Sequence, residues 1–165
     1  MAFRFSQIAL VASVAIFLTL IVVNNVTDYG SNFRYVEHVL SMDTTFSNNQ
    51  LKWRAITNPL MQHLFYGILI FWEASAAVLC WIGAFRLSQN FKADRESFHQ
   101  AKSIAVYGLV LSMLQWLLAF LVVGGEWFLM WQSATWNAQN AALRMFVVTG
   151  LILLFMSQSW EDLKK

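Results

Sequence analysis

Four long apolar stretches constrain this chain more than any other feature of its sequence. A helix needs roughly 20 apolar residues to cross the hydrocarbon core of a bilayer, and each stretch has about that length. The sequence therefore predicts an all-α membrane protein, a four-transmembrane-helix bundle that forms one membrane domain over residues 1–165. The predicted spans are residues 5–23, 60–85, 103–123 and 138–157.

The composition agrees with a chain embedded in lipid. Of the 165 residues, 58% are hydrophobic and only 12% are charged, whereas soluble domains carry about 25% charged residues. The net charge of +2 gives no reason to expect a nucleic-acid partner. Cys80 is the single cysteine, which excludes an intramolecular disulfide and a cysteine-based metal cage.

The first apolar stretch also has to be compared with a secretory signal peptide. Its apolar core exceeds the usual length of about 7–15 residues, and the sequence Val22-Val23-Asn24-Asn25 offers no cleavage site with small residues. We interpret the stretch as a helix that is retained.

The distribution of Lys and Arg predicts the orientation. Loops on the cytoplasmic side of a membrane protein are enriched in these residues. They gather at both termini and between the second and third spans, at Arg4, Arg86, Lys92, Arg95, Lys102, Lys164 and Lys165. We expect a multi-pass protein of the bacterial inner membrane with cytoplasmic N- and C-termini.

The connection between the first two spans, residues 24–59, is too long for a simple turn. Within it, Phe33, Val36 and Leu40 recur at helical spacing. This pattern predicts a short helix over residues 32–42 that lies in the extracytoplasmic interface of the membrane.

Two polar side chains fall inside predicted spans at similar depth, Glu73 in the second and Gln115 in the third. A carboxyl group within a membrane is costly, and by default it suggests a function. The plainer interpretation is that Glu73 and Gln115 hydrogen-bond across the two antiparallel spans and fix their register. The alternatives are a proton-relay or cofactor-contacting Glu73, and a Glu73 that faces a partner subunit. Small residues on the same helix faces predict close packing, namely Ala76, Ala77, Cys80, Ala84, Gly108, Ser112 and Ala119.

Arg144 lies one or two turns inside the fourth span. We expect its side chain to extend to the headgroups or to pair with Glu126 or Asp28. A contact with an anion, a lipid headgroup or a partner is the other interpretation.

Two histidines are predicted on the extracytoplasmic side, His38 on the interfacial helix and His63 near the start of the second span. With Glu37, Met42 and Asp43 they offer ligand types that bind copper or zinc, and two histidines can also hold a haem. No metal-binding spacing accompanies them, so hydrogen bonding is the plainer role. We therefore expect no cofactor, with haem or metal as the alternative.

The sequence carries no nucleophile elbow, phosphate-binding loop or dinucleotide fingerprint. We therefore expect a protein without enzymatic activity. Four spans with one buried acid and no inverted repeat give little basis for a carrier.

A set of motifs in the long connection and the second span resembles a bacterial family of predicted small integral membrane proteins, a domain of unknown function. The resemblance covers nearly the whole chain. It implies four spans and an inner-membrane location, and it implies no activity or ligand. The motifs are Asn25-Val26-Thr27-Asp28-Tyr29, Asn32-Phe33, Val36-Glu37-His38-Val39-Leu40-Ser41-Met42-Asp43, Trp53-Arg54-Ala55-Ile56 and Glu73.

These observations favour a non-catalytic accessory or scaffold subunit of a larger membrane complex, of a respiratory or other energy-converting kind. Its expected partners are the bilayer and other membrane protein subunits. The alternative is a haem- or metal-binding redox subunit that uses His38 and His63. A third hypothesis is proton or small-solute handling through Glu73.

Overall fold

The computed structural model describes residues 1–158, in which every regular element is a helix. Four of its helical segments are long and apolar enough to cross a membrane, which confirms the predicted fold class. Lys164 and Lys165, which contributed to the predicted orientation, lie outside the described residues. The membrane-spanning segments are α1 (Ala2–Thr27), α3 (Pro59–Gln89), α4 (Arg95–Leu114) continued by η2 (Gln115–Trp127), and α5 (Gln139–Ser157).

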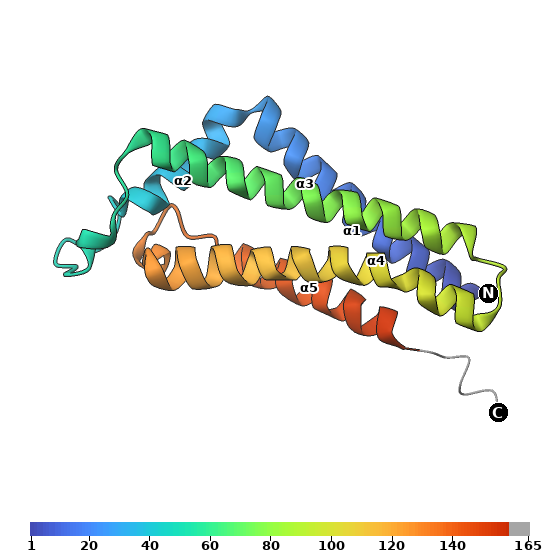
Figure 1. Ribbon diagram of the computed structural model, residues 1–165. Helices are drawn as coiled ribbons and strands as arrows, with labels where there is room; N and C mark the ends of the chain where they lie inside the picture. Colours follow the sequence, from blue (N-terminus) through green and yellow to red (C-terminus); the bar gives the residue numbers. More distant parts are fainter. Residues whose placement is uncertain (159–165) are drawn as a thin grey trace.

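The N-terminus and the connection between α3 and α4 lie at one end of an elongated bundle (Figure 1). The opposite end carries α2 (Tyr29–Ser41) and the loop that leads from it to α3 (Figure 1). Two short 3₁₀-helices, η1 (Lys52–Arg54) and η3 (Met130–Gln132), complete this end. We call residues 28–58 and 128–138 together the cap.

Local sequence sets the starts of the two central helices. Pro59 occupies the first turn of α3, and the Asn58 side chain accepts hydrogen bonds from the backbone N–H groups of Leu60 and Met61. Asp94 caps α4 in the same way, through the backbone N–H of Ser97.

Helices α3 and α4 approach each other closely where both carry small residues. A Cβ atom added at Gly83 would lie 2.5 Å from Cα of Ala105, and one added at Gly108 would lie 2.7 Å from Sγ of Cys80. Backbones can come this near only without larger side chains between them. The main core joins this seam to α1 and α5, through Val11, Ala15, Leu18, Ala76, Ala77, Leu109 and Met156.

The cap has an apolar core of its own. Helix α2 begins at Tyr29, three residues before the predicted position 32, and ends at Ser41. The next residue, Met42, has a left-handed conformation. Because a single residue separates α2 from α1, the long connection is helical over about its first half. The cap core consists of Val36, Leu40, Met42, Tyr66, Phe128 and Leu129.

Candidate functional site

The structure joins Glu73 and Gln115 as predicted. The side-chain Nε2 of Gln115 donates a hydrogen bond of 2.8 Å to Oε1 of Glu73. Both side chains are buried, and no described residue forms an ion pair with Glu73. The bond ties α3 to the α4–η2 helix at mid-depth.

A third helix contributes to the same carboxyl group. Nδ2 of Asn25 donates a hydrogen bond of 2.6 Å to Oε2 of Glu73. The hydroxyl group of Tyr66 lies 3.2 Å from both the backbone oxygen and Oδ1 of Asn25. We call Asn25, Tyr66, Glu73 and Gln115 the Glu73 cluster.

The sequence missed Asn25 as a partner of Glu73 because it placed the end of the first span at residue 23. Helix α1 continues to Thr27, so Asn25 belongs to its last turn and not to an extended loop. Asn32 supports this extension, because its Nδ2 donates to the backbone oxygens of Asn24 and Asp28, 3.2 and 3.0 Å away. Both carbonyls also accept a backbone N–H, from Asp28 and Asn32 respectively, so the Asn32 side chain adds a second bond to each at the junction of α1 and α2.

The helix that carries Gln115 changes its hydrogen-bond pattern at that residue. From Gln115 to Trp127 it is a π-helix, ending with a bond of 3.0 Å from Phe128 N to Val123 O. Wide turns of this kind are rare and occur frequently at functional sites. Oε1 of Gln115 and Nε1 of Trp116 are buried and have no hydrogen-bond partner among the described residues.

The Glu73 cluster borders a cavity of about 270 Å³ that extends from mid-membrane toward the cap. Polar side chains from four helical segments, α1, α2, α3 and η2, reach it, including Asn32 and Tyr35 on α2. Burial raises the pKa of Tyr35, and its hydroxyl group donates to the sulfur of Met130. The remaining lining comprises Ile21, Asn25, Val36, Tyr66, Leu69, Glu73, Trp116, Phe120 and Ala138.

His63 lies among aromatic rings on the exposed side of α3. Its Nδ1 is 2.8 Å from the hydroxyl group of Tyr29, and its ring stacks on Phe33 with 4.0 Å between centroids. Tyr29, a residue of the predicted extracytoplasmic motif, is thus an immediate partner of a candidate ligand.

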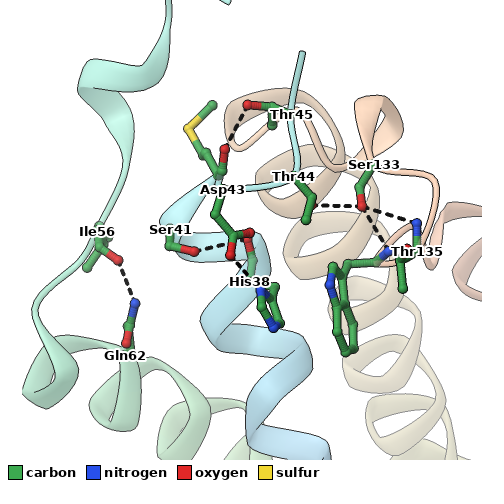
Figure 2. A network of polar contacts seen from close by, with 11 residues as sticks. His38, Ser41, Asp43, Thr44, Thr45, Ile56, Gln62, Ser133 and Thr135 are labelled. Atoms are coloured by element: carbon green, nitrogen blue, oxygen red, sulfur yellow. Dashed lines mark hydrogen bonds and ion pairs between the residues drawn. The ribbon is translucent and has the colours of Figure 1, made fainter. Parts of the chain in front are cut away.

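His38 belongs to a different group of contacts, the polar network of the cap (Figure 2). Its Nδ1 lies 2.7 Å from Oδ2 of Asp43, and its ring stacks on Trp136 with 4.5 Å between centroids. Nearby, Thr44 donates a bond of 2.9 Å to Ser133 (Figure 2), which ties the two segments of the cap together.

The structure does not bring the predicted metal ligands into one set. Within residues 1–158, no group of three or more His, Cys, Asp or Glu side chains is placed to hold a metal ion. Met42 is buried in the cap core and Glu37 is exposed. Asp43 is a hydrogen-bond partner of His38. The haem or metal alternative stays a prediction.

Other residues of the predicted motif hold the cap together. The guanidinium group of Arg54 lies over the rings of Trp127 and Trp53, at 4.5 and 5.4 Å, and donates to the Trp127 carbonyl. Thr27 bonds back to Val23 within α1, and Asp28 accepts from Asn32. These contacts are structural, and they place an aromatic surface at the cap.

Arg144 lies exposed on α5, and no described residue pairs with it. The expected ion pairs with Glu126 and Asp28 are therefore absent from residues 1–158. A contact with lipid or with a partner remains as the prediction for Arg144.

Two basic residues that the sequence assigned to the cytoplasmic surface are buried. Arg4 donates to the backbone oxygens of Phe91 and Ala93, and Lys102 donates to that of Met156 at 3.0 Å. Both contribute to packing at the end opposite the cap. Nothing in the sequence distinguishes these two residues from basic residues that are exposed to solvent.

Comparison with known proteins identifies the family of the chain. No curated protein and no solved structure gives a significant match. A family model described as "Predicted small integral membrane protein (DUF2165)" matches residues 3–159, which is nearly the whole chain. With its four apolar helices and its buried Glu73 cluster, the chain belongs to this family of small integral membrane proteins, DUF2165.

Proposed function

We propose that the protein is a non-catalytic accessory or scaffold subunit of a larger inner-membrane assembly, of a respiratory or other energy-converting kind. The observation that carries this proposal is that Arg144, on the least covered span, has no partner within residues 1–158.

Helix α5 is covered by the rest of the chain less than the other spans are. Within its most apolar window 17% of the residues are buried, against 28–33% in the other three spans. Its uncovered face is a continuous apolar strip, of which Leu151 is 61% exposed. The strip comprises Leu143, Val147, Leu151 and Leu154.

Arg144 adds a charge beside this strip, five residues after the first residue of α5. Arginine side chains within membrane helices are costly, and they usually pair with an acid or a carbonyl group. A second protein whose helix packs on the strip and offers such a group would satisfy Arg144. The bilayer alone would have to satisfy it through headgroup phosphates.

The proposal is tested in native membranes with the full chain. A photo-crosslinking residue at Leu151 is expected to give one discrete protein adduct, whereas the same residue at Phe71, exposed on α3, is expected to label lipid. Arg144→Gln should weaken the Leu151 adduct, and Arg86→Gln, an exposed arginine on α3, should leave it unchanged. Lipid adducts alone at Leu151, with a free monomer in mild detergent, would contradict the proposal.

A second candidate function is proton or small-solute handling through Glu73, and the cavity beside this carboxyl group favours it. It predicts that proteoliposomes containing the protein carry a proton flux that Glu73→Gln abolishes. An equal flux in the wild type and the variant would exclude it.

A further inference from the structure

The cavity beside the Glu73 cluster, called the polar cavity because Asn25, Asn32, Tyr66 and Glu73 form part of its lining, has room for a group larger than one water. Its volume of about 270 Å³ far exceeds the roughly 10–15 Å³ that one water needs by a comparable measure. Its polar side chains come from α1, α2, α3 and η2, so the folded bundle positions them together.

Two atoms next to this cavity have unmet hydrogen-bonding capacity. Trp116, which lines the cavity, is only 8% exposed, and its Nε1 has no acceptor among the described residues. Oε1 of the neighbouring Gln115 is also buried without a donor among the described residues, but Gln115 does not line the cavity. Buried polar groups are nearly always paired, so the Trp116 N–H calls for an acceptor in the cavity. The Glu73 carboxyl group, which does line it, can accept a further hydrogen bond from a donor there.

The charge of the lining restricts the class of ligand. Glu73 is its acidic side chain, and none of the lining residues is Lys, Arg or His. A phosphate or carboxylate would meet a carboxyl group with no cation to balance it. An ammonium group would leave the Trp116 donor unmet, because it accepts no hydrogen bond. A neutral head that carries hydroxyl groups can both accept from Trp116 and donate a hydrogen bond, and it brings no charge.

An apolar cavity of about 290 Å³ adjoins the polar one. Phe65, Ile68 and Leu118 line it, and the last two are 49% and 42% exposed, so the cavity opens toward the surrounding hydrocarbon. Trp72 also lines the apolar cavity. Its indole N–H donates a hydrogen bond of 3.0 Å to the Leu111 carbonyl, so it needs no partner in the cavity. The side chains that border both cavities are Tyr35, Val36, Leu69 and Phe120.

We propose that the two adjoining cavities bind one neutral amphipathic lipid. Its head lies in the polar cavity, where an oxygen accepts from Trp116 and a hydroxyl group donates to Glu73. Its tail passes Phe120 into the apolar cavity. Two sources share this chemistry, a prenylated quinol and a diacylglycerol.

Native mass spectrometry of the delipidated full chain tests the proposal. The probes are a short-tailed ubiquinol, dioctanoylglycerol, and dioctanoyl phosphatidic acid as an anionic comparison. We expect saturable binding of at least one neutral probe and none of the anionic one. The neutral probe that binds more tightly identifies the source.

Three variants locate the site. Trp116→Phe keeps the ring and removes the N–H donor, so binding should weaken by about tenfold, as the loss of one buried hydrogen bond predicts. Ala119→Phe adds bulk to the apolar cavity alone and should weaken it as strongly. Trp131→Phe, an exposed tryptophan of the cap, should bind as the wild type does.

Thermal unfolding of each variant shows whether it is folded. If one of the two site variants fails to fold, the other still tests the proposal. Saturable binding that both folded site variants retain would overturn the proposal. Absence of saturable binding of both neutral probes would overturn it as well, and would leave the accessory-subunit proposal untouched.

Discussion

Asn25, in the last turn of α1, donates a hydrogen bond of 2.6 Å to the Glu73 carboxyl group in the middle of α3. With the bond from Gln115, this contact connects three of the four spans through one side chain. The Glu73 cluster is therefore expected to stabilise the bundle as well as border a cavity.

Replacing Glu73 by leucine should destabilise the protein by about 1–3 kcal/mol, because Nδ2 of Asn25 and Nε2 of Gln115 would lose their acceptors inside the bundle. Thermal or denaturant unfolding in detergent measures the change. The double variant with Gln115→Leu should cost less than the sum of the single changes. Glu126→Leu, at an exposed acid, is the control, and an equal loss in the control would contradict the assignment.

Gly83→Ala should disrupt the seam between α3 and α4. The added methyl group would lie 2.5 Å from the Cα of Ala105, and backbone cannot give way as a flexible side chain does. We expect a loss of about 1–3 kcal/mol, as for other overpacked sites.

The matched control is Gly67→Ala in the same helix, where nothing lies within 4 Å of the added atom. That variant should be neutral or gain up to about 1 kcal/mol, since alanine favours a helix over glycine. Unfolding of both variants under the same conditions decides the matter. An equal change of stability in Gly83→Ala and Gly67→Ala would show that α3 and α4 do not pack as closely at Gly83 as the structure places them.

Asp94 should give the protein a small stability term that depends on pH. Hydrogen bonds from the backbone N–H and the hydroxyl group of Ser97 hold the pKa of Asp94 below its ordinary value of 3.8. A lowered native pKa means that the contribution is fully present above this ordinary value and is lost as the pH falls through the lower native value.

Asp94→Asn keeps a capping oxygen and removes the titrating group. The melting temperature of the wild type should therefore fall more steeply on acidification to about pH 2 than that of the variant. Because other carboxyl groups titrate in both proteins, the difference between the two curves is the relevant quantity. Parallel curves would show that the Asp94 cap does not form in solution.

His63→Phe should change stability by less than about 1 kcal/mol, because the new ring can still stack on Phe33 and the lost bond to Tyr29 is exposed. Unfolding measurements check this. The haem or metal alternative makes a different prediction, a haem absorption band or a stoichiometric metal that disappears in His63→Phe and in His38→Ala. Optical spectra and elemental analysis of the purified variants separate the two cases.

The spans and the Glu73–Gln115 bond could be predicted because both follow from quantities that a sequence contains. Hydropathy locates a span, and equal distances from the two helix ends place Glu73 and Gln115 at one depth. The four-span fold was confirmed on this basis. The helix over residues 32–42 was also expected, although α2 begins earlier, at Tyr29.

Asn25 and Trp116 could not be predicted as parts of the site. Asn25 has poor helix propensity and follows the apolar stretch, so hydropathy ends the span before it. The π-helix from Gln115 turns Trp116 and the following residues away from the direction that ordinary helical periodicity gives. The burial of Arg4 and Lys102 depends on the chain segments that surround them, which local charge patterns do not contain.

The single residue between α1 and α2 has a mechanical consequence. Because Asp28 alone connects the two helices, neither helix can move far without the other, and Asn25 lies only three positions before it. A tilt of α2 would turn the last helical turn of α1 and pull on the contact between Asn25 and Glu73. We therefore expect a movement of the cap to change the position of Asn25 relative to the Glu73 carboxyl group inside the membrane.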